Sequence, residues 1–307
     1  MGRGYLPPYV HTCTQPRPNT RTGASVAGMA LEELADGCYW WPGHDHGSPG
    51  VTNMGVVVDD DGITVIDTGM VRSQWEPFAD AVRALDIPVR RIVLTSGDIW
   101  HVGGTRAFTH AGVYATPAVS ALLDQPLAIA AYETFMPEFV EEFEELAVLG
   151  TRPATHLVDA PAVLTPRIEV IPAPGHTPGD LVVLVPDADV CFTGSLVTVN
   201  TTPLCFFGNP TEWVETLDAI APFATRFVPG RGPFGTSSDV ATLRAYVAAC
   251  IAARGELAAL ASGPWDTWSE RRFDAVNIEC AALRARNDGD IPPTMRAWIT
   301  PVPDSAG

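Results

Sequence analysis

The chain of 307 residues contains no lysine, so all 19 of its basic residues are arginine. Without lysine the protein forms no Schiff base, attaches no PLP and has no P-loop lysine for phosphate. Acidic residues number 36, which gives a formal charge of −17. Nucleic acids and anionic membranes are bound through basic surfaces, and this composition does not supply one. We therefore expect neither a nucleic-acid partner nor a membrane partner.

Cysteine is sparse, and long apolar runs are lacking. The cysteines form no C-x-x-C pair and stand at Cys13, Cys38, Cys191, Cys205, Cys250 and Cys280. This spacing argues against a disulfide framework or a zinc knuckle. No stretch approaches the ~20 apolar residues of a membrane span, and residues 1–30 contain no apolar core of the signal-peptide kind. We expect a reduced, cytoplasmic protein.

The residues that are present indicate a globular chain longer than one typical domain. Hydrophobic residues make up 46% of the sequence and charged residues 18%, which is enough to build an ordinary core. Residues 1–30 are rich in Pro, Gly and Thr without periodicity and predict an N-terminal arm. We expect the main domain to span 31–262, and 263–307 to form a C-terminal helical extension and tail.

Strand and helix patterns alternate along the main domain, which predicts an α/β fold. Short β-branched or aromatic runs predict strands at 38–41, 51–58, 63–66, 91–94, 113–115, 168–171, 181–185, 190–193 and 226–228, with a hairpin turn at Asp59–Gly62. Apolar residues at helical spacing predict helices at 73–85, 117–123, 211–220, 238–260 and 265–286, before a Pro-rich tail.

Residues 132–149 carry a stripe of aromatic and apolar residues surrounded by glutamates. The spacing predicts one amphipathic helix. Two roles fit it: packing against the body of the domain, or forming an aromatic lid over a pocket.

Several separated segments resemble the motifs of metallo-β-lactamase-fold hydrolases. They are Asn53–Val58 with Gly62–Gly69, Leu94–Gly104, Ala173–Asp180, Phe192–Ser195 and Val228–Gly232. Leu94–Gly104 lies where that family carries T-H-x-H-x-D-H-x-G-G, and the later segments follow in the family's order. The resemblance covers roughly residues 37–262. It implies a four-layer αβ/βα sandwich, the metallo-β-lactamase fold, followed here by the helical extension.

The family's metal ligands are largely replaced at the matching positions. In the long motif, Ser96 and Asp98 replace the first two histidines and Trp100 replaces the aspartate. In the later segments, Ser195 replaces the bridging acid and Arg231 replaces the final histidine. Only His101 and His176 remain as the family has them. Tryptophan has no acceptor nitrogen, and arginine is permanently protonated, so neither ligates a cation. The resemblance with these replacements therefore excludes a dinuclear zinc site.

Two readings of the metal site stay open. Asp98, His101 and His176 together offer one carboxylate and two imidazoles, a set found in mononuclear zinc or iron sites. Alternatively, the two histidines are satisfied loop residues in a site without metal. We expect no cofactor, or at most one divalent ion.

Arg231 places a fixed positive charge where the family holds a cation. A guanidinium there suits the carboxylate or phosphate of a substrate, or it forms a structural ion pair with Asp98 or Asp67. The resemblance gives Asp67 the role of orienting a ligand histidine. Trp100 would add an apolar face, and Ser96 and Ser195 polar contacts to substrate.

Catalysis in such a cleft would use its histidines and charged groups. We expect His176, more than His101, to transfer a proton on a small anionic substrate held by Arg231, with Asp98 nearby. Two further features have ordinary explanations. His44 and His46, in the Gly/Pro loop 42–50, form a solvated turn or supply ligands or a proton acceptor to the pocket. Cys205 follows Ser195 in a loop that could reach the cleft, and a free thiol there ordinarily behaves as a small hydrophobe.

The sequence therefore predicts an enzyme acting on a small molecule. The hydrolytic form would cleave an ester, lactone, thioester or amide. A metal-independent lyase, isomerase or cyclase using histidine acid–base chemistry is the alternative within the enzymes. A non-catalytic small-molecule-binding protein is the alternative from another class. The sequence does not indicate an oligomeric state.

Overall fold

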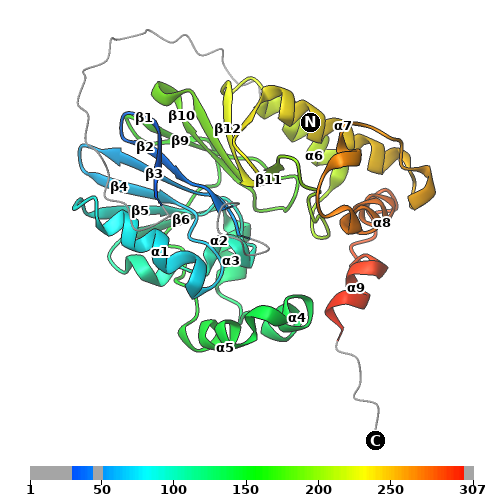
Figure 1. Cartoon of the computed structure of the whole chain (residues 1–307), viewed down its shortest axis with the longest axis horizontal. Helices are drawn as coiled ribbons and strands as arrows, with labels where there is room; N and C mark the ends of the chain where they lie inside the picture. The colour runs from blue at the N-terminus through cyan, green and yellow to red at the C-terminus, as the bar shows by residue number, and fades with distance from the viewer. Residues whose placement is uncertain (1–29, 44–50, 301–307) are drawn as a thin grey trace, which may run out of the picture.

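The computed structural model describes residues 30–43 and 51–300. Two mixed sheets pack face to face, and each is covered on its outer face by helices (Figure 1). The predicted N-terminal arm and the His44/His46 loop lie outside the described residues. Within the described part, no helix is both long and apolar enough to cross a bilayer. The cytoplasmic location stays a prediction.

The first sheet has seven strands in chain order. They are β1 (Glu32–Ala35), β2 (Cys38–Trp41), β3 (Met54–Asp59), β4 (Gly62–Ile66), β5 (Val89–Val93), β6 (Gly112–Ala115) and β7 (His156–Leu157). The first four are antiparallel, and β4 to β7 are parallel. Its outer face is covered by α1 (Arg72–Arg83), and α2 (Ile99–Val102) and α3 (Pro117–Leu123) follow β5 and β6.

The second sheet has six strands, in the order β13-β12-β11-β10-β9-β8. They are β8 (Ala162–Thr165), β9 (Ile168–Pro172), β10 (Leu181–Val185), β11 (Val190–Thr198), β12 (Arg226–Arg231) and β13 (Gly235–Thr236). Only β11 and β12 pair in parallel. Its outer face is covered by α6 (Pro210–Ile220) and α7 (Ser237–Ala252).

Buried apolar side chains fill the three interfaces between the four layers. Val57, Ile66 and Val93 of the first sheet pack against Val183 and Phe192 of the second. Further clusters join each sheet to its own helices. The predicted four-layer αβ/βα sandwich is confirmed.

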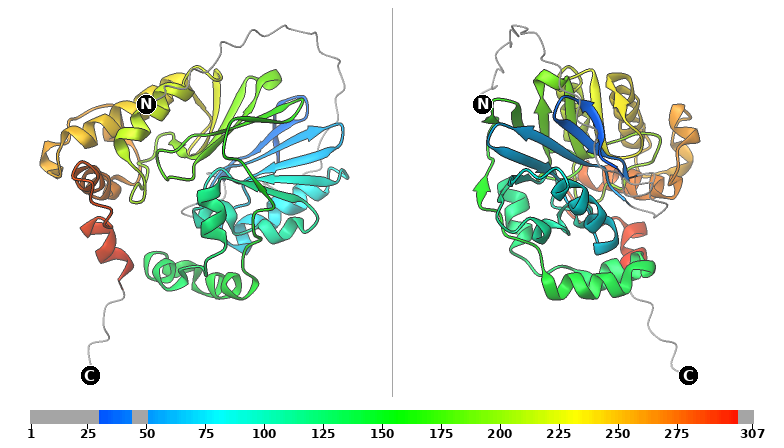
Figure 2. Two further views of the ribbon diagram at one scale, coloured as in Figure 1. Left: turned by 180° about the vertical axis from the view of Figure 1, so that it is seen from behind. Right: turned by 60° about the vertical axis from the view of Figure 1, so that its left-hand side comes forward.

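The 132–149 segment is not one helix. It consists of α4 (Ile129–Phe135), a short 3-10 turn at Pro137–Phe139 and α5 (Val140–Leu149). Pro137 lacks the backbone N–H that a continuous helix needs at that position, so the chain turns there. Phe143 and Leu146 pack on Met70 and Ile99, and Tyr132 and Phe135 of α4 pack against the same cluster. Both helices lie below the first sheet (Figure 1), and Figure 2 shows them from two further sides.

The C-terminal region also departs from the predicted helices. The helix predicted at 238–260 ends at Ala252, where Arg254 and Gly255 take positive φ angles. The 265–286 segment begins with 3-10 turns, and only α8 (Asp274–Arg284) is α-helical there. The Pro-rich tail contains a further helix, α9 (Pro293–Ile299), which starts at a proline and packs on Phe273 through Trp298.

The extension shares a core with the second sheet. Trp265, Trp268 and Ile278 pack in the same buried cluster as Trp213 and Leu217 of α6. The predicted boundary at 262/263 stays a prediction, but the packing makes the extension part of one continuous body.

We expect Tyr246→Phe to lower the free energy of unfolding by about 1–3 kcal/mol, because a buried hydrogen-bond network loses its centre. The Tyr246 hydroxyl donates to Asp274 (2.7 Å) and accepts from the Asn277 amide (2.8 Å), which ties α7 to α8. Urea unfolding measures the change. Tyr114→Phe, whose hydroxyl makes no hydrogen bond to the described residues, is the matched control and should cost under about 0.5 kcal/mol. Equal losses would contradict the role of the network.

Candidate active site

The candidate site lies where the ends of β4, β5, β11 and β12 meet. Helix α2, which carries Trp100 and His101, is seated there by two glycines. A Cβ on Gly103 would lie 1.6 Å from the Met70 carbonyl oxygen, and one on Gly104 would lie 2.3 Å from that of Thr68. Only glycine allows this approach, so the motif's two glycines fix His101 below the cleft.

His101 is fully buried, and both of its ring nitrogens are engaged. Nδ1 lies 2.8 Å from the Asp67 carboxylate, and Nε2 lies 2.7 Å from the Ser195 hydroxyl. Asp67 also accepts from the Thr95 backbone N–H (2.8 Å) and hydroxyl (2.6 Å). Burial lowers the pKa of His101, but the charge and hydrogen bond of Asp67 outweigh it and leave the pKa raised.

His176 is buried with one ring nitrogen satisfied and one open. Its Nε2 lies 2.8 Å from the Leu204 carbonyl oxygen, so Nε2 carries the proton. Its Nδ1 has no hydrogen-bond partner among the described residues, and the Asp98 carboxylate lies 3.8 Å away. Burial lowers the pKa of His176, which keeps the ring neutral. Thr177 and Asp180 fix the loop through two 2.6 Å hydrogen bonds, and burial raises the pKa of Asp180 to about 8.

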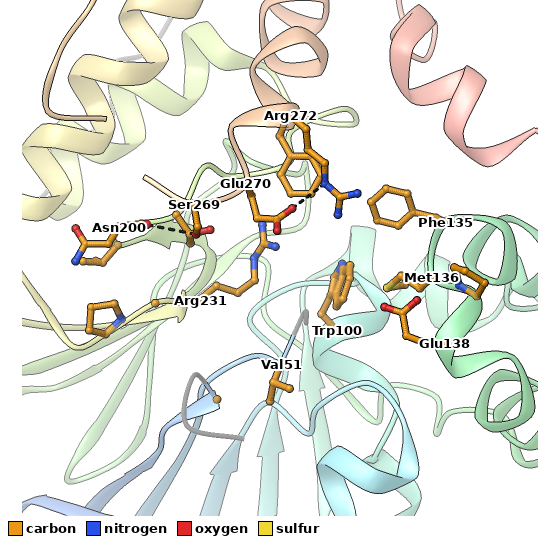
Figure 3. A pocket seen from close by; sticks show the side chains of 17 residues that line it. Val51, Trp100, Phe135, Met136, Glu138, Asn200, Arg231, Ser269, Glu270 and Arg272 are labelled. Carbon is orange, nitrogen blue, oxygen red and sulfur yellow. Dashed lines mark hydrogen bonds and ion pairs between the residues drawn. The ribbon is translucent and has the colours of Figure 1, made fainter. Parts of the chain in front are cut away.

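Arg231 projects from the end of β12 into a cavity of about 580 Å³ (Figure 3). Its guanidinium lies 5.9 Å from the ring centres of Trp100 and Phe273. It makes no hydrogen bond or ion pair within residues 30–43 and 51–300. Burial lowers its pKa, while the charges of Glu270 and Asp98 oppose that shift, and an arginine stays cationic in either case.

The cavity is lined from distant parts of the chain. Phe135 to Glu138 contribute from α4 and the turn after it, and Asn200 and Thr201 follow β11. The extension contributes Ser269, Glu270, Arg272 and Phe273. Arg272 is hydrogen-bonded to the Glu270 carboxylate at 2.8 Å. The sequence pattern did not reveal this contribution of the extension, because nothing in its spacing connects Phe273 to Arg231.

The sequence-predicted residues are thus only partly brought together. The sequence predicted that Arg231 and His101 face one pocket, with Trp100 or aromatic residues of 132–146 as its apolar wall. Arg231, Trp100 and Phe135 do line one cavity, but Asp98, His101, His176 and Ser195 are not among its lining residues. Ser96 is wrong as a substrate contact, because it is fully buried and its hydroxyl faces the Asp98 backbone N–H.

Asp67 and Asp98 do not pair with Arg231. Asp67 is hydrogen-bonded to His101, so it orients that histidine rather than His176. Asp98 lies beside His176. The reading of Arg231 as a structural ion pair therefore finds no support among the described residues. Cys205 is buried, as expected, with Sγ 3.8 Å from the His176 carbonyl oxygen.

The residues do not fit a metal centre. Both nitrogens of His101 are occupied, and Trp100 and Arg231 stand at two former ligand positions. The described residues contain no group of three His, Cys, Asp or Glu that could hold a metal ion, so Asp98, His101 and His176 do not form the predicted three-ligand site. The metal content of the purified protein stays a prediction.

We expect elemental analysis of protein purified without added metal or chelator to find at most one divalent ion per chain. The reason is that too few acceptor atoms remain free in the cleft. If an ion is found, His176→Ala should remove it, because His176 Nδ1 is the open nitrogen. Two tightly held ions per chain would contradict this prediction.

The comparisons with known proteins agree with this fold. The family model of the Metallo-beta-lactamase superfamily matches residues 47–232, so the chain belongs to this superfamily, whose members are generally hydrolases. No curated protein matches the chain.

Among solved structures, the chain is similar to the DIM-1 metallo-beta-lactamase, at 18% identity and a TM-score of 0.56 over 73% of this chain and 99% of that one. It is also similar to a metallo beta lactamase from Erythrobacter litoralis, at 16% identity and a TM-score of 0.56, over 73% and 98%. The mono-zinc form of FIM-1 from Pseudomonas aeruginosa matches at 19% identity and a TM-score of 0.56, over 72% and 95%. At these identities, the likeness concerns the fold alone.

Proposed function

We propose that this protein is a hydrolase-like enzyme for a small anionic acyl compound, an ester, lactone, thioester or amide. In this proposal it works without the superfamily's dinuclear metal site. The observation that carries the proposal is the guanidinium of Arg231, which lines the cavity and has no hydrogen-bond or ion-pair partner among the described residues. Superfamily membership supports the reaction class.

An unpaired cation inside a protein is costly, so it points to a ligand that completes it. Arg231 presents a planar set of donors that matches a carboxylate, and its stacking on Trp100 and Phe273 holds it in place. Arg272 is already paired with Glu270. Arg231 is therefore the anchor for the substrate's anionic group, and the aromatic wall takes its organic part.

His176 is the proton acceptor in this proposal. Its Nδ1 is a free acceptor on a neutral ring, whereas both His101 nitrogens are engaged. The Leu204 carbonyl fixes the tautomer that leaves Nδ1 unprotonated. His176 Nδ1 takes a proton from the hydrolytic water, and the protonated ring then returns it to the leaving group. Asp98, 3.8 Å away, stabilises that transient cation.

Paired substrates test the proposal. Each acyl compound in a panel of esters, lactones, thioesters and amides is offered with a free carboxylate and as the matching neutral methyl ester. We expect hydrolysis of one anionic member at a kcat/KM at least about tenfold above its neutral partner, because the guanidinium recognises only the anion. Equal rates for both members, or hydrolysis of none, would contradict the proposal. Binding without turnover would instead favour the non-catalytic alternative.

A further inference from the structure

Asp67, His101 and Ser195 form a continuous hydrogen-bonded chain. The Asp67 carboxylate can only accept, so His101 Nδ1 carries the proton and donates it across 2.8 Å. In the neutral ring Nε2 is an acceptor, and the Ser195 hydroxyl donates to it across 2.7 Å. A hydroxyl donating to an imidazole that is oriented by a carboxylate is the arrangement by which serine nucleophiles are activated.

The backbone holds Ser195 in this position through two glycines. Gly194 has φ +51°, and a Cβ there would lie 1.9 Å from the Thr95 hydroxyl oxygen, the same group that donates to Asp67. A Cβ on Gly230 would lie 2.7 Å from the Ser195 backbone nitrogen. Because neither glycine has a side chain, strands β11 and β12 approach each other closely. Gly194 of β11 also lies directly against Thr95, the residue that donates to Asp67.

The serine is the most accessible of these three hydrogen-bonded residues. Ser195 keeps 9% of its surface accessible, whereas Asp67 keeps 2% and His101 none. Gly230, which touches the Ser195 backbone, is followed directly by Arg231. The serine and the arginine anchor are therefore carried by adjacent positions of the paired strands β11 and β12.

We propose that Ser195 is a nucleophile that forms a covalent acyl-enzyme, with His101 as its general base and Asp67 as the residue that positions His101. The inference rests on the proposed function for its substrate class. Nothing in the superfamily match assigns this role, because the resemblance gives Ser195 only the position of a bridging metal ligand.

The step balances without any further reactant. Ser195 Oγ forms a bond to the substrate carbonyl carbon while its proton passes to His101 Nε2. The bond from that carbon to the leaving oxygen, sulfur or nitrogen breaks, and the leaving group takes the proton from Nε2. Water then attacks the acyl carbonyl carbon and gives one proton to His176 Nδ1. The bond from that carbon to Ser195 Oγ breaks, and the protonated His176 returns this proton to the released Ser195 oxygen.

A neutral fluorophosphonate tests the inference separately from the substrate's charge. Its phosphorus bonds to an activated serine oxygen and fluoride leaves, so intact mass and a peptide map report the site. We expect one adduct per wild-type chain, on Ser195, and none on Ser195→Ala. His101→Gln should slow labelling at least about 100-fold, since the base is lost. Ser238→Ala is the matched control, since Ser238 is an exposed serine of α7 that does not line the cavity, and it should label like the wild type.

The outcomes separate the two proposals. The wild-type peptide map locates the adduct even if a variant fails to fold, and thermal unfolding checks each variant. An unlabelled wild type, or an adduct on another residue, would overturn the serine nucleophile. If Ser195→Ala still hydrolyses the anionic substrate, the nucleophile assignment is wrong although the proposed function stands. If Ser195 is labelled but no anionic substrate is preferred, the proposed function fails and the nucleophile stands.

Discussion

Arg231→Met should raise the Kd for a small anionic ligand at least about 30-fold and leave the neutral methyl ester of the same ligand nearly unaffected. Methionine preserves the packing between Trp100 and Phe273 but removes a charge of the cavity that has no ion-pair partner among residues 30–43 and 51–300. Removing one partner of a buried, hydrogen-bonded charge pair lowers the binding free energy by about 2 kcal/mol or more, which corresponds to about 30-fold in Kd. Isothermal titration of the carboxylate and its ester measures the difference.

Two further variants control this result. Arg231→Lys should also weaken binding, because an ammonium keeps the charge but loses the planar fork. Arg272→Met removes a second cation of the same cavity, yet its charge is already met by Glu270, so we expect a loss under about fivefold. If Arg272→Met weakened binding of the anion as much as Arg231→Met does, the assignment of Arg231 as the anchor would be wrong.

His176→Gln should lower kcat at least about 100-fold while changing KM little. Glutamine keeps a polar side chain in the loop fixed by Thr177 and Asp180, but it cannot accept and return a proton near neutral pH. Steady-state kinetics on the anionic substrate selected by the paired panel separates the two constants.

His110→Gln is the matched control for His176→Gln. His110 is exposed and lies outside the cavity. The kcat and KM of His110→Gln should therefore equal those of the wild type. Wild-type kcat in His176→Gln would show that the proton moves through another group. A loss confined to KM would make His176 a binding residue.

Much of the fold is predictable from the sequence because its strands are short β-branched runs with turn residues between them. The predicted ranges 38–41, 117–123 and 181–185 coincide with β2, α3 and β10. Errors arise where one residue interrupts a pattern that is otherwise continuous. Pro137 divides an amphipathic stripe into α4 and α5, and β11 continues through Gly194 to Thr198 by a register shift.

The candidate site is less predictable, because motif positions fix the backbone but not the partner of each side chain. The replacements at Trp100 and Arg231 correctly predicted a cavity with a cation and an aromatic face. The sequence could not show that His101 turns both nitrogens to Asp67 and Ser195. Nor could it show that Phe273, beyond the matched segment, completes the aromatic contact to Arg231.

In the proposed mechanism, the cleft uses its own side chains in place of the dinuclear metal site that the family resemblance implies. The most direct test is kcat/KM for the selected anionic substrate, measured on one preparation before and after exhaustive dialysis against a chelator, and again after zinc is added back. The account predicts the same kcat/KM, within about twofold, in all three measurements, because Arg231 and the histidines supply the charge and the base. Activity that is lost on chelation and restored by zinc would contradict it.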